Sequence, residues 1–218
     1  MKSILIVGLG RFGTQLARKF HELGDEVMVI DRDEEKVQQA IPFADEAQIG
    51  DCRREDVLRS LGVEDFDVCF VCMGEQFQSS LEVTLLLKEL GAKHVVSKCG
   101  SEIQEKFLLR NGADEVWNPE RELAAKLAVR YSANHLYDYF SICENAGVYE
   151  MPIMHTWIGK TVRELDMRNV YGLNILGVKK TDGRVITMPG ANYVFENEDH
   201  VIAFARHDAA NALMNKIK

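Results

Sequence analysis

The stretch MKSILIVGLGRFGTQLARKFHELGDEVMVIDR, residues 1–32, decides the fold of the N-terminal part of the chain. Ile4–Val7 is an apolar run without alternation, as expected of a strand buried on both faces of a parallel sheet. After a glycine-rich turn, apolar residues recur at helical spacing until Gly24, and a second buried strand, Val27–Ile30, ends on Asp31. The inner face of the intervening helix is expected to carry Leu16, Ala17, Phe20 and Leu23.

The turn itself carries three glycines in the spacing G-x-G-x-x-G, namely Gly8, Gly10 and Gly13. Between a strand and a helix, this spacing is typical of a nucleotide-binding turn. The first glycine makes the tight turn, the second lets the backbone approach a phosphate, and the third lets helix and strand pack closely. The phosphate would lie on the exposed N–H groups of the helix N-terminus. A glycine-rich turn kept only for packing is the alternative.

The same alternation of apolar strands and amphipathic helices continues as far as Asn118. Further strands are expected at 47–49, 68–71, 94–98 and 114–117, and further helices at 33–41, 54–61, 76–90 and 102–110. The helix at 76–90 is expected to face the core with Leu81, Leu85, Leu86 and Leu90. Six strands that alternate with helices predict a Rossmann-like, doubly wound parallel sheet of the α/β class.

Ligands of such a sheet bind beyond the carboxyl ends of the strands, near the switch in strand order. Asp31 suits a bidentate hydrogen bond to the ribose hydroxyls of NAD(H), ATP or ADP, whereas Arg32 could hold the 2′-phosphate of NADP, which Asp31 would repel. Asp51 could accept a hydrogen bond from an adenine amino group or be an ordinary turn aspartate. Lys98 could reach a phosphate or be solvated at its strand end. The remaining binding residues predicted at these strand ends are Cys52, Met73 and Gly74.

Composition limits the classes of function. The chain has 218 residues, a formal net charge of −8 and no basic stripe, which argues against nucleic-acid binding. We recognise no signal peptide and no apolar run long enough to span a bilayer, so any membrane contact is expected to be peripheral. The five cysteines, an odd number, favour reduced thiols. Cys69 and Cys72 have the spacing of a metal or redox pair, but strand geometry puts them on opposite faces, so we interpret them as small buried hydrophobes.

The C-terminal part begins with a further helix that Pro119 starts. Glu120 in its first turn complements the helix dipole, or alternatively binds a divalent cation shared between subunits. We expect this helix to run to about residue 134, and we predict a nucleotide-binding domain at 1–134 and a small α+β domain at 135–218. In the second domain, strands are expected at 148–153, 174–179, 185–188 and 200–205, helices at 156–165 and 209–214, and an Asp-Gly hairpin turn at 181–184.

No catalytic apparatus is recognisable beside the glycine turn. A dehydrogenase needs an acid/base pair near the nicotinamide. His155, His200 and His207 have no carboxylate at a spacing typical of a catalytic dyad, and Glu75 is the one obvious candidate near the loop after the fourth strand. The sequence therefore favours a nucleotide sensor that is not an enzyme, with a small NAD(P)-dependent oxidoreductase as the alternative.

The order of several motifs, over essentially the whole chain, resembles the RCK (regulator of potassium conductance) family. The similarity is strongest to the cytosolic gating subunits of Ktr/Trk-type bacterial potassium uptake systems. The motifs are GLGRFG (8–13), Asp31, Gly50-Asp51, LLLKEL (85–90), GAD (112–114), NPE (118–120), GKTVREL (159–165) and NILGV (174–178).

This resemblance implies a homodimer that assembles into a homo-octameric ring. The ring would be cytoplasmic and would dock on the cytosolic face of the cell membrane, against an integral membrane potassium-translocating subunit. ATP, ADP or NAD(H) would bind in the N-terminal domain and change the shape of the ring. Several relatives carry two tandem copies of the unit, whereas this chain has one, which favours the ring-forming type.

The resemblance also implies roles for individual residues. In the Gly-Arg-Phe-Gly motif, Phe12 belongs to the binding turn, and Arg11 would reach across the dimer to a neighbour's terminal phosphate and so distinguish ATP from ADP. Glu120 falls where relatives place an acid near a divalent cation between subunits. Some relatives bind cyclic di-AMP in the C-terminal domain. The matching region here contains Arg168, Asn169 and Ile175.

Overall fold

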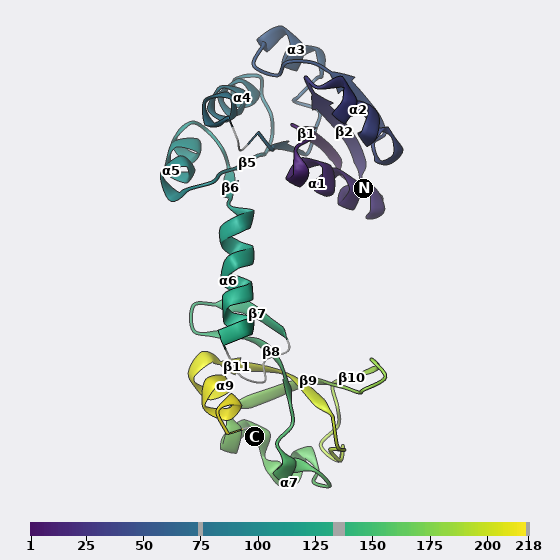
Figure 1. Cartoon of the computed structure of the whole chain (residues 1–218), viewed down its shortest axis with the longest axis vertical. Coiled ribbons are helices and arrows are strands. Elements are labelled where there is room, and N and C mark those ends of the chain that lie inside the picture. The colour runs from purple at the N-terminus through teal and green to yellow at the C-terminus, as the bar shows by residue number, and fades with distance from the viewer. Residues whose placement is uncertain (74–75, 133–137, 217–218) are drawn as a thin grey trace. The chain divides into compact units, whose positions relative to one another are not determined.

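The computed structural model (Figure 1) describes residues 1–73, 76–132 and 138–216. These residues form two compact units, Met1–Glu120 and Arg121–Lys218. The domain boundary predicted at residue 134 lies outside the described residues and stays a prediction. Within the described ranges, no helix combines the length and the apolar character needed to cross a bilayer.

The first unit is built on a parallel sheet of six strands in the order β3-β2-β1-β4-β5-β6. The bounds are β1 Ser3–Val7, β2 Glu26–Asp31, β3 Glu46–Ile49, β4 Val68–Val71, β5 Val95–Lys98 and β6 Glu115–Trp117. Because β1 pairs with both β2 and β4, the strand order reverses beside it. This topology confirms the predicted doubly wound α/β sheet.

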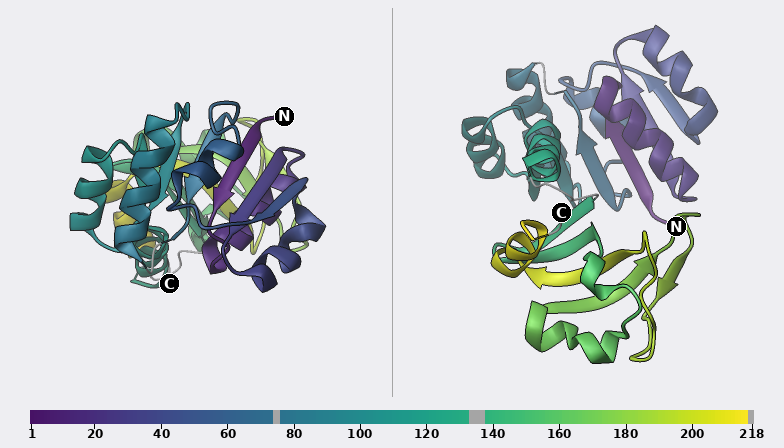
Figure 2. Two further views of the ribbon diagram at one scale, coloured as in Figure 1. Left: turned by 90° about the horizontal axis from the view of Figure 1, so that it is seen from above. Right: turned by 60° about the horizontal axis from the view of Figure 1, so that its bottom comes forward.

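Helices lie on both faces of this sheet, as Figure 2 shows. Their bounds are α1 Arg11–Glu22, α2 Glu34–Ala40, α3 Glu55–Ser60, α4 Phe77–Glu89 and α5 Glu102–Arg110, with a 3-10 helix, η1, at Ile41–Phe43. The buried residues of α1 and α2 pack on one face, and those of α3 and α4 pack on the other. The unit therefore has three layers, with the sheet in the middle.

Strand β1 is the centre of this core because its side chains alternate between the two helical layers. Ile4 and Ile6 pack with α1 and α2, whereas Leu5 and Val7 pack with α3 and α4. All four side chains are at most 1% exposed. The strand is thus buried on both faces, as its unbroken apolar run predicts.

Two predicted helix faces are partly wrong. Leu23 is 67% exposed because α1 ends at Glu22 and Leu23 only follows as its C-cap. On α4, Leu85 is 41% exposed, and the fully buried positions are instead Ser79, Ser80, Val83, Thr84 and Leu87. Small hydroxyl side chains let the helix approach the sheet closely, and the Oγ1 atom of Thr84 lies 2.8 Å from the Oγ atom of Ser97 in β5.

The two cysteines with C-x-x-C spacing lie on opposite faces of the sheet. Cys69 packs in the α3/α4 layer and Cys72 in the α1/α2 layer. Burial raises the pKa of each thiol to about 12, so both are protonated at neutral pH. Their interpretation as small buried hydrophobes is confirmed.

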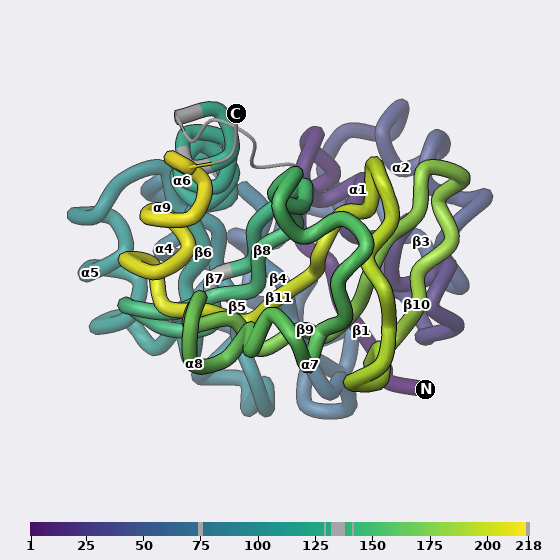
Figure 3. Tube along the Cα trace, turned by 90° about the horizontal axis from the view of Figure 1, so that it is seen from below, coloured from purple at the N-terminus to yellow at the C-terminus, as the bar shows by residue number. Residues whose placement is uncertain are grey.

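The second unit contains most of α6 (Pro119–Ser132) and an antiparallel sheet in the order β10-β9-β11-β8-β7. The strand bounds are β7 Asp138–Cys143, β8 Ala146–Pro152, β9 Leu173–Lys179, β10 Val185–Thr187 and β11 His200–Arg206. Figure 3 traces these strands together with the last helix, α9 (His207–Met214). The core of the unit surrounds Trp157 and Phe195, which are 0% and 1% exposed.

The second unit departs from the sequence-based prediction in three places. The helix predicted at 156–165 is a 3-10 helix, η2 (His155–Trp157), and a short α7 (Val162–Leu165), because Gly159 between them has a φ of +78°. The prediction missed α8 (Met167–Tyr171) and β7. Phe140 and Ile142 in β7 are 63% and 55% exposed, so that strand has no clear burial pattern. The Asp-Gly turn is confirmed, with Gly183 at a φ of +85°.

Candidate functional site

The three glycines after β1 have three different surroundings. Gly8 has a φ of +97°, and its N–H donates a hydrogen bond to the carbonyl of Ile30 in β2. A Cβ atom on Gly13 would lie 2.0 Å from the carbonyl oxygen of Gly8, so the close contact of α1 with the turn needs a glycine there. A Cβ atom on Gly10 would meet no heavy atom within 4 Å. The space beside Gly10 is therefore open to a ligand.

This open space adjoins the N-terminus of α1. Gly10 is the N-cap residue and offers no capping side chain, and the first turn of α1 contains no acidic residue. The N-terminal N–H groups and the positive end of the helix dipole are therefore not compensated by a carboxylate of the helix itself. The arrangement suits an anion such as a phosphate.

Asp31 is fixed beside the same turn. Its Oδ2 atom accepts a hydrogen bond of 2.7 Å from the N–H of Leu9, and its Oδ1 atom accepts one of 2.9 Å from the N–H of Asp33. Each carboxylate oxygen keeps a further lone pair, so the group can still accept hydrogen bonds from two vicinal hydroxyls. The geometry fits the ribose of a nucleotide whose phosphate lies at Gly10.

At the end of β3, Asp51 forms a bidentate ion pair with Arg53. The distances are 2.5 Å from Nη2 to Oδ2 and 2.9 Å from Nε to Oδ1. The Arg53 hydrogen bond is the largest influence on Asp51 and, with the charge of Arg32, lowers its pKa to about 2. Asp51 is therefore ionised and an acceptor at neutral pH. Cys52 lies in the core of this unit, and its burial, with the charges of Asp51 and Asp31, raises the pKa of its thiol to about 12.

A group of charged and aromatic side chains lies at the ends of β5 and β6. The Nζ atom of Lys98 lies 2.8 Å from the Oε1 atom of Glu120 and 5.8 Å from the centre of the Phe12 ring. The hydrogen bond from Lys98 lowers the pKa of Glu120, and the charge of Arg11 contributes to the same shift. The structure thus brings together Arg11 and Phe12 of α1, Lys98 of β5 and Glu120 of α6.

The sequence points to all four residues, but the Lys98–Glu120 ion pair was not predicted from it. A usable signal was present, because β5 and β6 are parallel neighbours and their carboxyl ends lie at the same edge. Met73 is also near the turn, since its Cγ atom would lie 3.1 Å from a Cβ atom on Gly8. Gly74 and Glu75, the other predicted residues of that loop, lie outside the described residues.

The predicted metal and cyclic di-AMP sites stay predictions. Within the described ranges, no group of three or more His, Cys, Asp and Glu side chains is placed to hold a metal ion. In the second unit, Arg168 donates a hydrogen bond of 3.0 Å to Asn174, and Asn169 donates to both carboxylate oxygens of Asp166. Ile175 is half-buried against the core of that unit.

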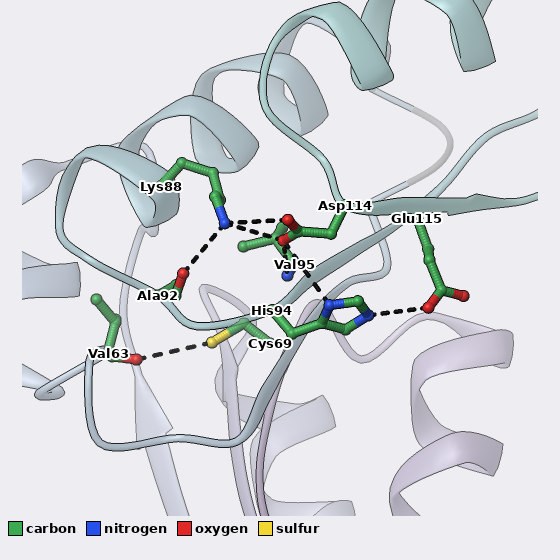
Figure 4. Close-up of polar contacts among 8 residues, drawn as sticks. All are labelled: Val63, Cys69, Lys88, Ala92, His94, Val95, Asp114 and Glu115. Carbon is green, nitrogen blue, oxygen red and sulfur yellow. Dashed lines mark hydrogen bonds and ion pairs between the residues drawn. The ribbon is translucent and has the colours of Figure 1, made fainter.

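A second polar cluster lies at the opposite, amino-terminal ends of β5 and β6 (Figure 4). The Nε2 atom of His94 is 3.0 Å from Glu115, and the Nζ atom of Lys88 is 2.9 Å from Asp114. Asp114 also accepts a hydrogen bond of 2.7 Å from the N–H of Val95, so the cluster ties α4 to the sheet. It is away from the glycine turn, because parallel strands place their amino and carboxyl ends at opposite edges.

One expectation about histidines needs correction. His200, for which the sequence shows no carboxylate at a spacing typical of a catalytic dyad, lies with its Nδ1 atom 3.4 Å from Glu150 in β8. Glu150 also forms an ion pair of 2.8 Å with Lys179 in β9. The antiparallel pairing of β11 with β8 and β9 creates this contact between residues that are far apart in the sequence.

Comparisons with known proteins identify the architecture. A family model described as the TrkA-N domain matches residues 4–119, and one described as the TrkA-C domain matches residues 148–218. The Ktr system potassium uptake protein C of Bacillus subtilis (strain 168) is 38% identical over 201 residues, which cover 92% of this chain and 90% of the relative.

Solved structures share the fold at lower identity. A structure described as the GsuK channel bound to NAD has a TM-score of 0.68 and 19% identity, covering 99% of this chain and 39% of that chain. GsuK bound to ADP gives a TM-score of 0.51 and 19% identity over 59% of this chain and 34% of that chain. The family models and the 38% identical relative lead to one conclusion: the chain belongs to the RCK family, the regulators of potassium conductance built from TrkA-N and TrkA-C domains.

Proposed function

We propose that this chain is a nucleotide-sensing regulatory subunit that acts in the cytosol and gates a membrane potassium-translocating subunit. The observation that carries the proposal is the open space at Gly10, bounded by the N-terminus of α1 and by the fixed carboxylate of Asp31. The names of the relatives support it. They describe potassium uptake for the Bacillus subtilis protein and bound NAD or ADP for GsuK structures.

The proposed mechanism is a shift of population between two shapes of an oligomeric ring. The phosphates would bind at Gly10 and the α1 N-terminus, the ribose at Asp31, and the adenine near Asp51. Cys52, Met73, Gly74 and Arg32 would border this ligand, with Lys98 and Phe12 near the phosphates. Two nucleotides can drive the ring in different directions only if they differ in affinity for its two shapes.

Assembly and further ligands belong to the same proposal. The subunit would form a homodimer and then a homo-octameric ring on the cytosolic face of the membrane. Glu120 would contribute to a divalent-cation site between subunits, and Arg168, Asn169 and Ile175 to a cyclic di-AMP site. The oxidoreductase alternative depended on Glu75, outside the described residues, and the described pair His94–Glu115 lies at the wrong edge of the sheet for it.

Ligand-dependent unfolding of the full chain tests the proposal. ATP, ADP or NAD(H) at about 100 times its dissociation constant is expected to stabilise the folded chain by about 2.7 kcal/mol. NADP(H) is expected to give less, because Asp31 repels a 2′-phosphate. The measurements are thermal unfolding and size-exclusion chromatography with light scattering. A monomer that only NADP(H) stabilises would contradict the proposal.

Arg11→Ala is expected to weaken ATP binding much more than ADP binding. A lost charge-assisted contact to the terminal phosphate corresponds to about tenfold or more in the ATP dissociation constant. Arg18→Ala is the matched control, since Arg18 lies on the same helix and its guanidinium faces the ring of Phe43. Isothermal titration calorimetry measures both nucleotides. Equal losses for ATP and ADP would show that Arg11 does not contact the terminal phosphate.

A further inference from the structure

Lys98 is a largely buried cation near the glycine turn. Its side chain is only 18% exposed and its ammonium group faces the ring of Phe12, the second residue of α1. The positive charge of Lys98 also acts on the thiol of Cys72, which follows β4. Lys98 therefore lies between the ends of β4 and β5 and the N-terminus of α1, on the side where a ligand's phosphate would bind.

In this structure, the partner of Lys98 is a carboxylate of the protein itself. Glu120 accepts a hydrogen bond of 2.8 Å from the Nζ atom and also lies within the influence of Arg11. A carboxylate is chemically similar to a phosphate, because each presents anionic oxygens to a cation. Glu120 thus occupies Lys98, and lies within the influence of Arg11, the two cations that the proposed function assigns to the phosphates.

We propose that Glu120 is an intramolecular competitor of the ligand, which holds Lys98 until a phosphate at the α1 N-terminus displaces it. This inference rests on the proposed function and adds to it a device that sets nucleotide affinity. Glu120 is 66% exposed, so its ion pair with Lys98 is weak enough for a phosphate to displace. The phosphate carries more charge and also interacts with the helix N–H groups.

The exchange has a structural consequence for α6. Glu120 is the second residue of that helix, and its contact with Lys98 attaches the first turn of α6 to the end of β5. A phosphate that takes Lys98 removes this attachment. By linkage, whatever strengthens the Lys98–Glu120 pair weakens phosphate binding to the same degree.

Glu120→Gln tests the inference because it keeps the size of the side chain and removes its charge. In a buffer with EDTA and no divalent cation, the variant is expected to bind ADP about fivefold more tightly than the unmodified chain, on the scale of an exposed ion pair. Glu122→Gln is the matched control, since Glu122 is an exposed glutamate in the same first turn and is expected to leave the affinity unchanged. Calorimetric titration of the full chain gives the dissociation constants.

A second comparison tests whether Glu120 acts through Lys98. In a Lys98→Gln background, Glu120→Gln is expected to have little further effect on ADP binding, so the two substitutions are not additive. The inference is overturned if Glu120→Gln leaves affinity unchanged or weakens it, if Glu122→Gln has the same effect, or if the gain persists without Lys98. Failure of the unmodified chain to bind ADP, ATP or NAD(H) would overturn the proposed function as well.

Discussion

Asp31→Asn is expected to lose binding of ATP, ADP and NAD(H) by at least about a hundredfold. The carboxylate is held by the N–H groups of Leu9 and Asp33, which leaves one lone pair on each oxygen for a ribose hydroxyl. An amide offers one acceptor oxygen instead of two, and each hydrogen bond to a charged group contributes about 1.5–3 kcal/mol. Isothermal titration calorimetry with each nucleotide measures the loss.

Asp33→Asn is the matched control for this prediction. Asp33 is the N-cap residue of α2 and accepts a hydrogen bond of 3.1 Å from the N–H of Glu35. Because asparagine caps helices as well as aspartate does, the control is expected to keep both stability and nucleotide affinity. Retention of full affinity by Asp31→Asn would exclude Asp31 as the ribose-binding group.

Gly13→Ala is expected to destabilise the folded chain by about 3 kcal/mol or more, because its Cβ atom would collide with backbone rather than with a flexible side chain. The Cβ atom would lie 2.0 Å from the carbonyl oxygen of Gly8, and this clash can be relieved only if α1 moves away from the turn. The midpoint of thermal unfolding of the first unit should fall on the order of 10 °C. Differential scanning calorimetry measures the shift.

Gly10→Ala separates folding from binding at the same turn. The Cβ atom has no neighbour within 4 Å and the residue has an ordinary φ of −68°, so stability should change by less than about 1 kcal/mol. The methyl group would nevertheless occupy the space assigned to a phosphate, so nucleotide affinity should fall. Normal nucleotide affinity in Gly10→Ala would contradict the position assigned to the phosphate.

Much of the first unit could be predicted because its strands and helices have strong, local patterns. Ile4–Val7 is apolar throughout and lies in the centre of the sheet, and the glycine turn follows it directly. The face of α4 could not be predicted from apolar residues alone. There, the fit between Thr84 and Ser97 decides the contact, and that fit depends on which strand lies beneath the helix.

The candidate site was only partly predictable, because the contacts between its side chains depend on which strands and helices lie side by side. Strand ends identify Asp31, Asp51 and Lys98, because all parallel strands finish at one edge. The partners of these residues depend on side-chain geometry. Arg53, two residues from Asp51, and Glu120, which pairs with Lys98, both became evident only from the structure.

The central place of β1 has a consequence during synthesis of the chain. Among the strands of the first unit, β1 is synthesised before the others, and its neighbour β2 follows soon after. Its other neighbour, β4, is made much later, because Val68, which pairs with Ile4, lies 64 residues further along the chain. At translation rates of about 5–20 residues per second, the second edge of β1 has no partner strand for roughly 3 to 13 seconds. During that time this apolar strand presents unpaired N–H and C=O groups to any other nascent chain.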